Sequence, residues 1–397
     1  MSTAETETLA PPPSHASACV GPGSESAGKA SSCEGCPNQG ACASGTAAAP
    51  TEEELRIAAC MSRVRHRVLV LSGKGGVGKS TFSAQLAYAL ARRGLRVGLL
   101  DVDICGPSIP TMLGLKGREV HQSASGWSPV YVDVVPATST PSPEELEGEL
   151  CVMSIGFLMP DPDAAVIWRG PRKSGLLAQF FGSVDWGELD YLVVDTPPGT
   201  SDEHISIVQL LKQSLNPQTD GAVVVTTPQE VAMADVRKEL SFCRQTNIRV
   251  IGVVENMAPL SLPLDALSFR RAADGSDATG AFLAALRLRL PEFAGALTVS
   301  VDVFPQFGGG PAAMAAKFGV PFLGSIPLDR ELQRACDDGT PLADVGRSTA
   351  YRPLADVVSR VIDATDPLVV DRAKKRRAEE ARVAGVASGS GRVVVGR

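Results

Sequence analysis

Gly73–Thr81, with the sequence GKGGVGKST, decides the fold of this 397-residue chain. It matches the pattern G-x-x-x-x-G-K-[ST], follows the apolar run RVLVLS and leads into FSAQLAYALARRG, an amphipathic stretch that ends at Gly94. Glycines let backbone N–H groups surround phosphate oxygens, while Lys79 would reach the β- and γ-phosphates and Ser80 would hold Mg²⁺. We therefore predict a site for ATP with Mg²⁺. The predicted phosphate-contacting residues are Gly73, Gly75, Gly76, Val77, Gly78, Lys79, Ser80 and Thr81.

Five further apolar runs rich in Val, Ile and Leu follow this loop, with helical sequence between most of them. They are RVGLLDVD, YLVVDTPPG, GAVVVTTPQ, VIGVVENM and FLGSIPLD. Continuous apolar strands that alternate with helices form parallel sheets covered on both faces. The sequence therefore predicts an α/β, doubly wound, mainly parallel P-loop NTPase fold with a disordered, cysteine-bearing N-terminal segment.

The composition changes along the chain and predicts its division. Residues 1–55 are Ala, Ser, Gly, Pro and Glu with few large apolar side chains, so they cannot bury enough surface to fold alone. We expect a P-loop ATPase domain over residues 60–370, with an insertion at about 265–300. Residues 371–397 begin with DRAKKRRAEEAR and are expected to be a charged, flexible tail.

The overall composition excludes several classes of partner. A net charge of -6 argues against a nucleic-acid-binding surface. The apolar runs are far shorter than the about 20 residues that span a bilayer, so no membrane segment is expected. The first twenty residues lack a basic start and an apolar stretch, and nine cysteines do not form a disulfide framework in a chain of this length. We expect the protein in the reducing cytosol.

Two acidic segments stand at predicted strand ends. Asp101 and Asp103 follow one strand, and Asp195 follows another. Ligands of open α/β sheets bind at the carboxyl ends of the strands, where a carboxylate orients water or the shell of a metal ion. Asp101 is equally consistent with a site residue and with a strand-end cap.

Four cysteines in the N-terminal segment, Cys19, Cys33, Cys36 and Cys42, have the spacing C-x13-C-x2-C-x5-C. Four thiolates can hold a [4Fe-4S] cluster. They can equally hold a structural zinc ion, and the spacing does not decide between the two. The cysteines predict a metal site in either case.

The loop GKGGVGKST resembles the deviant Walker A of the group that contains MinD, the arsenite-pump ATPase and the nitrogenase iron protein. The resemblance implies that Lys74 reaches the phosphates bound by a partner subunit. It also implies that Lys74, Lys79 and Asp103 are the catalytic residues. Asp103 would activate water and Asp195 would lie in the outer shell of the metal.

The same resemblance implies an adenine pocket. Asn256 stands where this group reads the base, and Pro327 and Asp329 are expected to line the pocket.

The cysteine spacing in front of the loop resembles the eukaryotic cytosolic branch of the Mrp/NBP family of nucleotide-binding proteins. DVDICGPSIPTMLGL, IWRGPRKSG and FGGGPAAMAAKFGVPFLGSIPLD carry this likeness, which spans roughly Cys19 to Asp338. The family implies an N-terminal [4Fe-4S] cluster and its delivery to cytosolic and nuclear apoproteins. It also implies slow, partner-dependent ATP hydrolysis by a homodimer, or by a heterodimer with a related P-loop ATPase.

One feature departs from that family, which has a C-x2-C pair soon after ENM that holds a cluster between two subunits. Here Asn256-Met257 is followed by APLSLPLDALSF, and no cysteine lies between Cys243 and Cys336. The shared cluster is therefore in doubt. Two alternatives remain: a nucleotide-dependent interaction protein with a structural zinc or redox site, and a positioning ATPase of the MinD type. The second leaves the four cysteines without a role.

Overall fold

The computed structural model describes residues 29–30, 39, 51–104, 106–123, 126–134, 148–159, 170–200, 202–212, 214–305, 308–342 and 348–389. The chain divides into two compact units, Met1–Leu55 and Arg56–Arg397. Nearly all described residues belong to the second unit, which contains the predicted phosphate loop. Cys19, Cys33, Cys36 and Cys42 lie outside the described residues.

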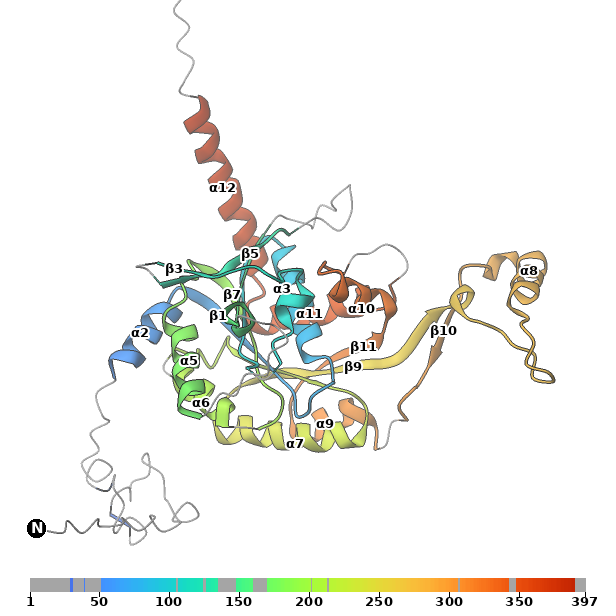
Figure 1. Ribbon diagram of the computed structural model, residues 1–397, viewed down its shortest axis with the longest axis horizontal. Coiled ribbons are helices and arrows are strands. Elements are labelled where there is room, and N and C mark those ends of the chain that lie inside the picture. Colours follow the sequence, from blue (N-terminus) through green and yellow to red (C-terminus); the bar gives the residue numbers. More distant parts are fainter. Residues whose placement is uncertain are drawn as a thin grey trace, which may run out of the picture. The chain divides into compact units, whose positions relative to one another are not determined.

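A mainly parallel sheet forms the centre of the second unit (Figure 1). Over the described residues it has nine strands in the order β10-β9-β8-β1-β7-β2-β6-β5, and β11 pairs with β9. The strands are β1 (Val64–Leu71), β2 (Arg96–Asp101), β5 (Val130–Val132), β6 (Glu149–Ser154), β7 (Leu189–Asp195), β8 (Gly221–Thr226), β9 (Val250–Pro263), β10 (Thr298–Val301) and β11 (Phe322–Leu328). Only β5 and β10 pair antiparallel with their neighbours in this described sheet. A separate hairpin joins β3 (His121–Ser123) and β4 (Gly126–Ser128).

The strands alternate their side chains between two apolar layers. In β1, Val68 and Val70 belong to one buried cluster, whereas Leu69 and Leu71 belong to the other. Since successive side chains of a strand point to opposite faces, a strand covered on both sides needs an unbroken apolar run. The predicted doubly wound, mainly parallel fold is confirmed.

Helices cover each face of this sheet. Over the described residues they are α2 (Glu52–Met61), α3 (Lys79–Ala91), α4 (Ile109–Met112), α5 (Gly170–Gly182), α6 (Asp202–Leu211), α7 (Glu230–Gln245), α8 (Thr279–Arg289), α9 (Gly310–Phe318), α10 (Arg330–Asp337), α11 (Tyr351–Thr365) and α12 (Val369–Gly389), with 3₁₀ turns η2 (Ile155–Leu158), η3 (Leu264–Ala266) and η4 (Pro291–Phe293). Residues of α3, α10 and α11 contribute to the layer around Val68, and residues of α5, α7 and α9 to the layer around Leu69. No helix in the described ranges is long and apolar enough to cross a membrane.

The segment expected as an insertion is an arm attached to the sheet edge (Figure 1). Strand β9 continues to Pro263 and pairs with β10, and α8 lies between these two strands along the chain. Helix α8 has no buried residue, and Phe282 and Leu288 are exposed. The arm therefore adds no layer to the core.

Residues 371–389, placed in a charged tail from the sequence, are helical. Val369 and Ala373 are buried at the start of α12. The Arg376 guanidinium donates to both oxygens of Asp190, at 3.0 and 2.9 Å. Burial alone would raise the pKa of Asp190, but the hydrogen bonds from Arg376 and the Arg96 amide lower it. The charged run is therefore anchored to the sheet at its first turns.

Glu239 is a fully buried residue of α7, and neither carboxyl oxygen has a hydrogen-bond partner. Burial raises the pKa of this carboxyl from 4.5 to about 8. The folded state thus keeps a proton that the unfolded state releases above about pH 4.5. The contribution of this carboxyl to the free energy of unfolding is present at low pH. It is lost as the pH rises to about 8, by up to about 1.4 kcal/mol per pH unit.

We predict that Glu239→Gln, which stays neutral, removes this loss. The urea midpoint of the variant should match the parent near pH 4 and exceed it increasingly toward pH 8. Glu292→Gln, at an exposed carboxyl of η4, is the control and should follow the parent at every pH. Equal pH slopes for the Glu239→Gln variant and the parent would contradict the prediction.

Candidate nucleotide-binding site

The phosphate loop joins β1 to α3 and depends on glycine at defined points. Gly76 and Gly78 have φ of 81° and 82°, which residues with a Cβ rarely adopt. A Cβ at Gly73 would lie 2.5 Å from the backbone carbon of Asp235 on α7, so this helix approaches too closely for any other residue. A Cβ at Gly76 would meet nothing within 4 Å, so the space in front of the loop is open.

Lys79, the first residue of α3, is held by Asp195 at the end of β7. Its Nζ lies 2.7 Å from Asp195 Oδ1, and both side chains are almost completely buried. Ser80 Oγ donates to the other oxygen of Asp195 at 2.6 Å, and Ser83 Oγ donates to Oδ1 at 2.7 Å. One carboxylate thus binds the predicted phosphate-binding lysine and the predicted Mg²⁺-binding serine together.

A second carboxylate lies beside the first because β2 pairs with β7 in parallel register. Asp101 is opposite Asp195 in this register. Asp101 accepts hydrogen bonds from Ser154 Oγ at 2.8 Å and from the Asp103 amide at 3.1 Å. Burial and the charge of Asp195 raise the pKa of Asp101 well above its ordinary value. Asp101 therefore supports the turn that carries the half-buried Asp103, in the manner of a cap.

Lys74 and Thr81 lie on different sides of the loop. Lys74 is exposed. The hydrogen bond from Lys238 lowers the pKa of Asp235 on α7, and the charge of Lys74 lowers it further. Lys74 therefore lies close to α7. Burial raises the pKa of the Cys336 thiol on α10, and Gln85 and Thr81 lower it in part. Lys74 is therefore exposed beside α7, whereas Thr81 lies near α10.

The expected adenine residues lie on the adjacent strands β9 and β11. Asn256 Nδ2 donates to the carbonyl oxygen of Val77 at 2.9 Å, so this residue holds the phosphate loop directly. Pro327 is buried in β11. Asp329 caps α10, where one oxygen accepts from the amides of Glu331 and Leu332 and the other from Thr349. The Asp329 carboxylate is thus occupied by structural hydrogen bonds.

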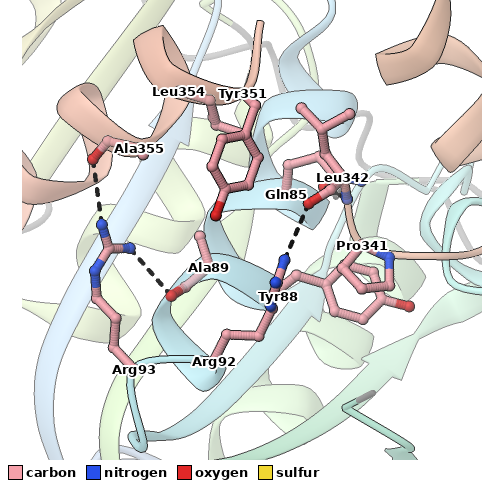
Figure 2. Close-up of a pocket in the computed structure, with 10 residues that line it drawn as sticks. All are labelled: Gln85, Tyr88, Ala89, Arg92, Arg93, Pro341, Leu342, Tyr351, Leu354 and Ala355. Carbon is pink, nitrogen blue, oxygen red and sulfur yellow. Dashed lines mark hydrogen bonds between the residues drawn. The ribbon is translucent and has the colours of Figure 1, made fainter. Parts of the chain in front are cut away.

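The residues that the loop brings together fit a Mg²⁺-nucleotide. Lys79 supplies a cation for phosphate, and Ser80 and Asp195 supply the hard oxygen atoms that Mg²⁺ prefers. A separate cavity of about 240 Å³ lies farther along α3, between Tyr88, Arg92 and Tyr351 (Figure 2). No residue of Gly73–Thr81 lines it, so it is distinct from the phosphate site.

The described cysteines do not form a metal centre. Cys60, Cys151, Cys243 and Cys336 are free thiols. Burial raises the pKa of Cys151 and of Cys243 to about 12, so both remain protonated at neutral pH. Within the described residues, no group of three or more His, Cys, Asp or Glu side chains gathers in a way that could hold a metal ion.

The structure adds three residues near the loop that were not among the predicted site residues. Ser83 and Ser154 each hydrogen-bond one of the paired carboxylates. His204 on α6 is 2% exposed, and burial lowers its pKa to about 4, so its imidazole is neutral. Only the spacing of Ser83, four residues after Lys79, offers a sequence signal, because it places both on one helix face.

Comparison with known proteins finds a family model, curated relatives and solved structures that are similar to this chain. A family model described as ParA, the NUBPL iron-transfer P-loop NTPase, matches residues 63–268. The chain is 44% identical over 355 residues to the cytosolic Fe-S cluster assembly factor Nubp1 homolog of Drosophila melanogaster, covering 89% of this chain and 98% of that protein. The nucleotide-binding protein of Archaeoglobus fulgidus in complex with ADP is 33% identical, with a TM-score of 0.50, over 72% of this chain and 91% of that chain.

We predict opposite effects of Asp195→Asn on the free and the nucleotide-bound protein. Removing one partner of a buried pair leaves Lys79 without its counter-charge and should lower the stability of the free protein by about 3–5 kcal/mol. Phosphate can then take the place of the carboxylate. Differential scanning fluorimetry without Mg²⁺ should show a larger ADP-induced rise in Tm for the variant than for the parent.

Asp220→Asn is the matched control. It breaks another buried pair, in which Asp220 lies 2.6 Å from the Arg67 guanidinium, away from the phosphate loop. It should destabilise the free protein but leave the ADP-induced rise in Tm at the parental value. A smaller rise for Asp195→Asn than for the parent would show that the carboxylate does not compete with phosphate for Lys79.

Proposed function

Because the chain belongs to the ParA family of NUBPL-type iron-transfer P-loop NTPases, we propose that it is a cytosolic ATPase that assembles iron–sulfur clusters. The proposal takes its biological setting from the relative named as a cytosolic Fe-S cluster assembly factor. The observation that carries the ATPase part is the contact of Lys79 and Ser80 with one buried carboxylate at the mouth of the phosphate loop.

In this proposal ATP displaces the internal ion pair. The β- and γ-phosphates would take Lys79 from Asp195, and Ser80 and Asp195 would then be the residues that hold Mg²⁺, Ser80 directly and Asp195 through the outer shell. Mg²⁺ supplies charge neutralisation when bound. Asp103 orients the attacking water, and Asn256 keeps the loop in place through Val77 while it reads the base. Pro327 and Asp329 would line the base pocket through their backbone, since the Asp329 carboxylate is occupied.

A second subunit completes the site. Lys74 is exposed at the start of the loop, and a Cβ at Gly76, two residues later, would meet nothing within 4 Å. We propose that it reaches the phosphates of a partner, either a second copy or a related P-loop ATPase. Closure of the dimer then depends on nucleotide, because only the bound state supplies the anion that Lys74 neutralises.

Residues 1–55 supply the cargo site. We propose that Cys19, Cys33, Cys36 and Cys42 hold a [4Fe-4S] cluster, which residues 60–370 help to deliver to apoproteins through ATP-dependent conformational change. Residues 371–397 would be an accessory tail, anchored by the first turns of α12. The cluster is the bound cargo, and nucleotide acts on the subunits that carry it.

A nucleotide-dependent interaction protein with a zinc or redox site is the second candidate. The observation that favours it lies in β9, where Met257–Pro263 contain no cysteine and the last four residues, Leu260–Pro263, pair with β10. A cluster between subunits would need ligands from elsewhere. The metal bound to the N-terminal cysteines distinguishes this candidate from the first.

We predict that Lys74→Ala abolishes ATP-dependent dimerisation and slows ATP hydrolysis by about a hundredfold or more, because charge stabilisation supplied by a partner is lost. Light scattering with ATP and Mg²⁺ measures the mass, and phosphate release measures the rate. Lys238→Ala removes a nearby exposed lysine of α7 and should leave both unchanged. A dimeric, active Lys74→Ala variant would exclude the role of Lys74 across the interface.

We also predict about four irons and four acid-labile sulfides per chain in anaerobically purified protein, because one cubane cluster needs four cysteine ligands. The double variant Cys33→Ala/Cys36→Ala should lose both. About six irons would mean that a cluster shared by two chains forms through other ligands. Zinc without sulfide would overturn the assembly proposal and favour the interaction protein.

A further inference from the structure

A groove of about 600 Å³ lies beside the paired carboxylates, between α4 with its following loop and η2. The residues that the argument uses are Pro110, Leu115, Lys116, Arg118, Phe157 and Leu158. Ligand sites in proteins have volumes of about 300–1,000 Å³, so the groove has room for a few residues of an extended peptide.

Both walls of the groove are joined to the nucleotide site. One wall begins at Pro107, four residues after Asp103. The other wall is η2, whose capping residue Ser154 accepts from the Gly156 amide at 3.0 Å and donates to Asp101 at 2.8 Å. A single hydroxyl therefore connects a carboxylate beside the phosphate loop with the wall of the groove.

The two walls touch at Gly156. A Cβ at this position would lie 3.0 Å from Pro110 Cγ and 3.5 Å from Pro107 Cβ. Contacts this tight leave little freedom for one wall to move without the other. A shift of Asp101 or Asp103 on nucleotide binding would therefore be passed to both walls of the groove and change its shape.

The lining is apolar inside and positive at the rim. Phe157, Leu158 and Met159 are consecutive, partly exposed apolar residues. Lys116 and Arg118 are exposed, and Glu119 is the one acidic residue among the described lining residues. The rim is positive although the chain as a whole carries a net charge of -6, so it complements an acidic partner.

We propose that this groove binds an extended, apolar and acidic segment of a client protein, and that bound nucleotide sets its affinity. The proposal rests on the proposed function, because it assigns the surface that receives the protein to be loaded. Apolar side chains of the segment fill the space between Leu115 and Leu158, and its carboxylates contact Lys116 and Arg118. Ser154 transmits the state of Asp101 to the η2 wall.

Two fluorescein-labelled heptapeptides provide the test by fluorescence anisotropy. One has the sequence Asp-Leu-Phe-Glu-Leu-Met-Asp, and the other has lysine at each acidic position. The acidic peptide should bind the full chain about tenfold or more tightly than the basic one, since its contacts with Lys116 and Arg118 change from attractive to repulsive. Its affinity should also differ between ADP and a non-hydrolysable ATP analogue with Mg²⁺.

Variants locate the binding. Leu158→Asp and the double variant Lys116→Glu/Arg118→Glu should each weaken the acidic peptide by about tenfold or more. Matched controls repeat the same changes at exposed sites, Leu288→Asp on α8 and Lys374→Glu/Lys375→Glu on α12, and should bind as the parent does. Ser154→Ala should still bind the peptide but lose the difference between nucleotides.

The outcomes separate this proposal from the assembly function. Iron and sulfide content and binding of a fluorescent nucleotide are measured on each variant, so that a folding defect or the absence of a cluster is detected independently. No binding of the acidic peptide, or equal loss in the control variants, would overturn the groove as a client site even where the cluster is present. Equal affinity in both nucleotides would overturn its coupling to Asp101.

Discussion

The ion pair between Lys79 and Asp195 is the interaction on which the arrangement of this site depends. Asp195 ends a central strand and accepts from Lys79, Ser80 and Ser83 at the first turns of α3. Each of these buried charges is stabilised by the other, because burying an unpaired charge is energetically unfavourable. The pair therefore fixes the start of α3 against the sheet, and in the proposed function phosphate would replace Asp195 as the partner of Lys79.

Parallel strand register extends this constraint to neighbouring elements. Asp101 lies opposite Asp195, and Ser154 lies opposite Asp101 on the next strand. Three adjacent strand ends thus carry two sets of hydrogen bonds, one around Asp195 at the phosphate loop and one that joins Asp101 through Ser154 to η2. The sheet itself is rigid, so the segments able to respond to nucleotide are the loops after these strands. This is the physical basis for linking the groove beside η2 to the nucleotide site.

Regions away from these strand ends serve other purposes. The β9–β10 arm exposes several apolar residues and contributes nothing to the core, whereas α12 is joined to the sheet through Val369, Ala373 and Arg376. Asp329 illustrates how a residue in a conspicuous motif can be used for structure, since its carboxylate caps α10 and holds the turn around Thr349. A motif thus identifies the position of a residue in the chain. It does not identify which atoms of that residue can still bind a ligand.

The sequence alone determined the fold class, because an unbroken apolar run is required of any strand covered on both faces. It also determined the phosphate loop, where Gly, Lys and Ser have a fixed spacing within one continuous segment. Strand β6 was not among the predicted apolar strands, since its run starts at Glu149. The short strands β5 and β10 are fixed by pairing with strands distant in the chain. Only the tertiary structure decided that Asp101 supports Asp103, that Asn256 holds Val77 and that Ser83 and Ser154 join the carboxylates. Apart from the local bond between Asp101 and the Asp103 amide, these contacts depend on how elements far apart in the chain pack together, and strand order leaves no local trace in the chain.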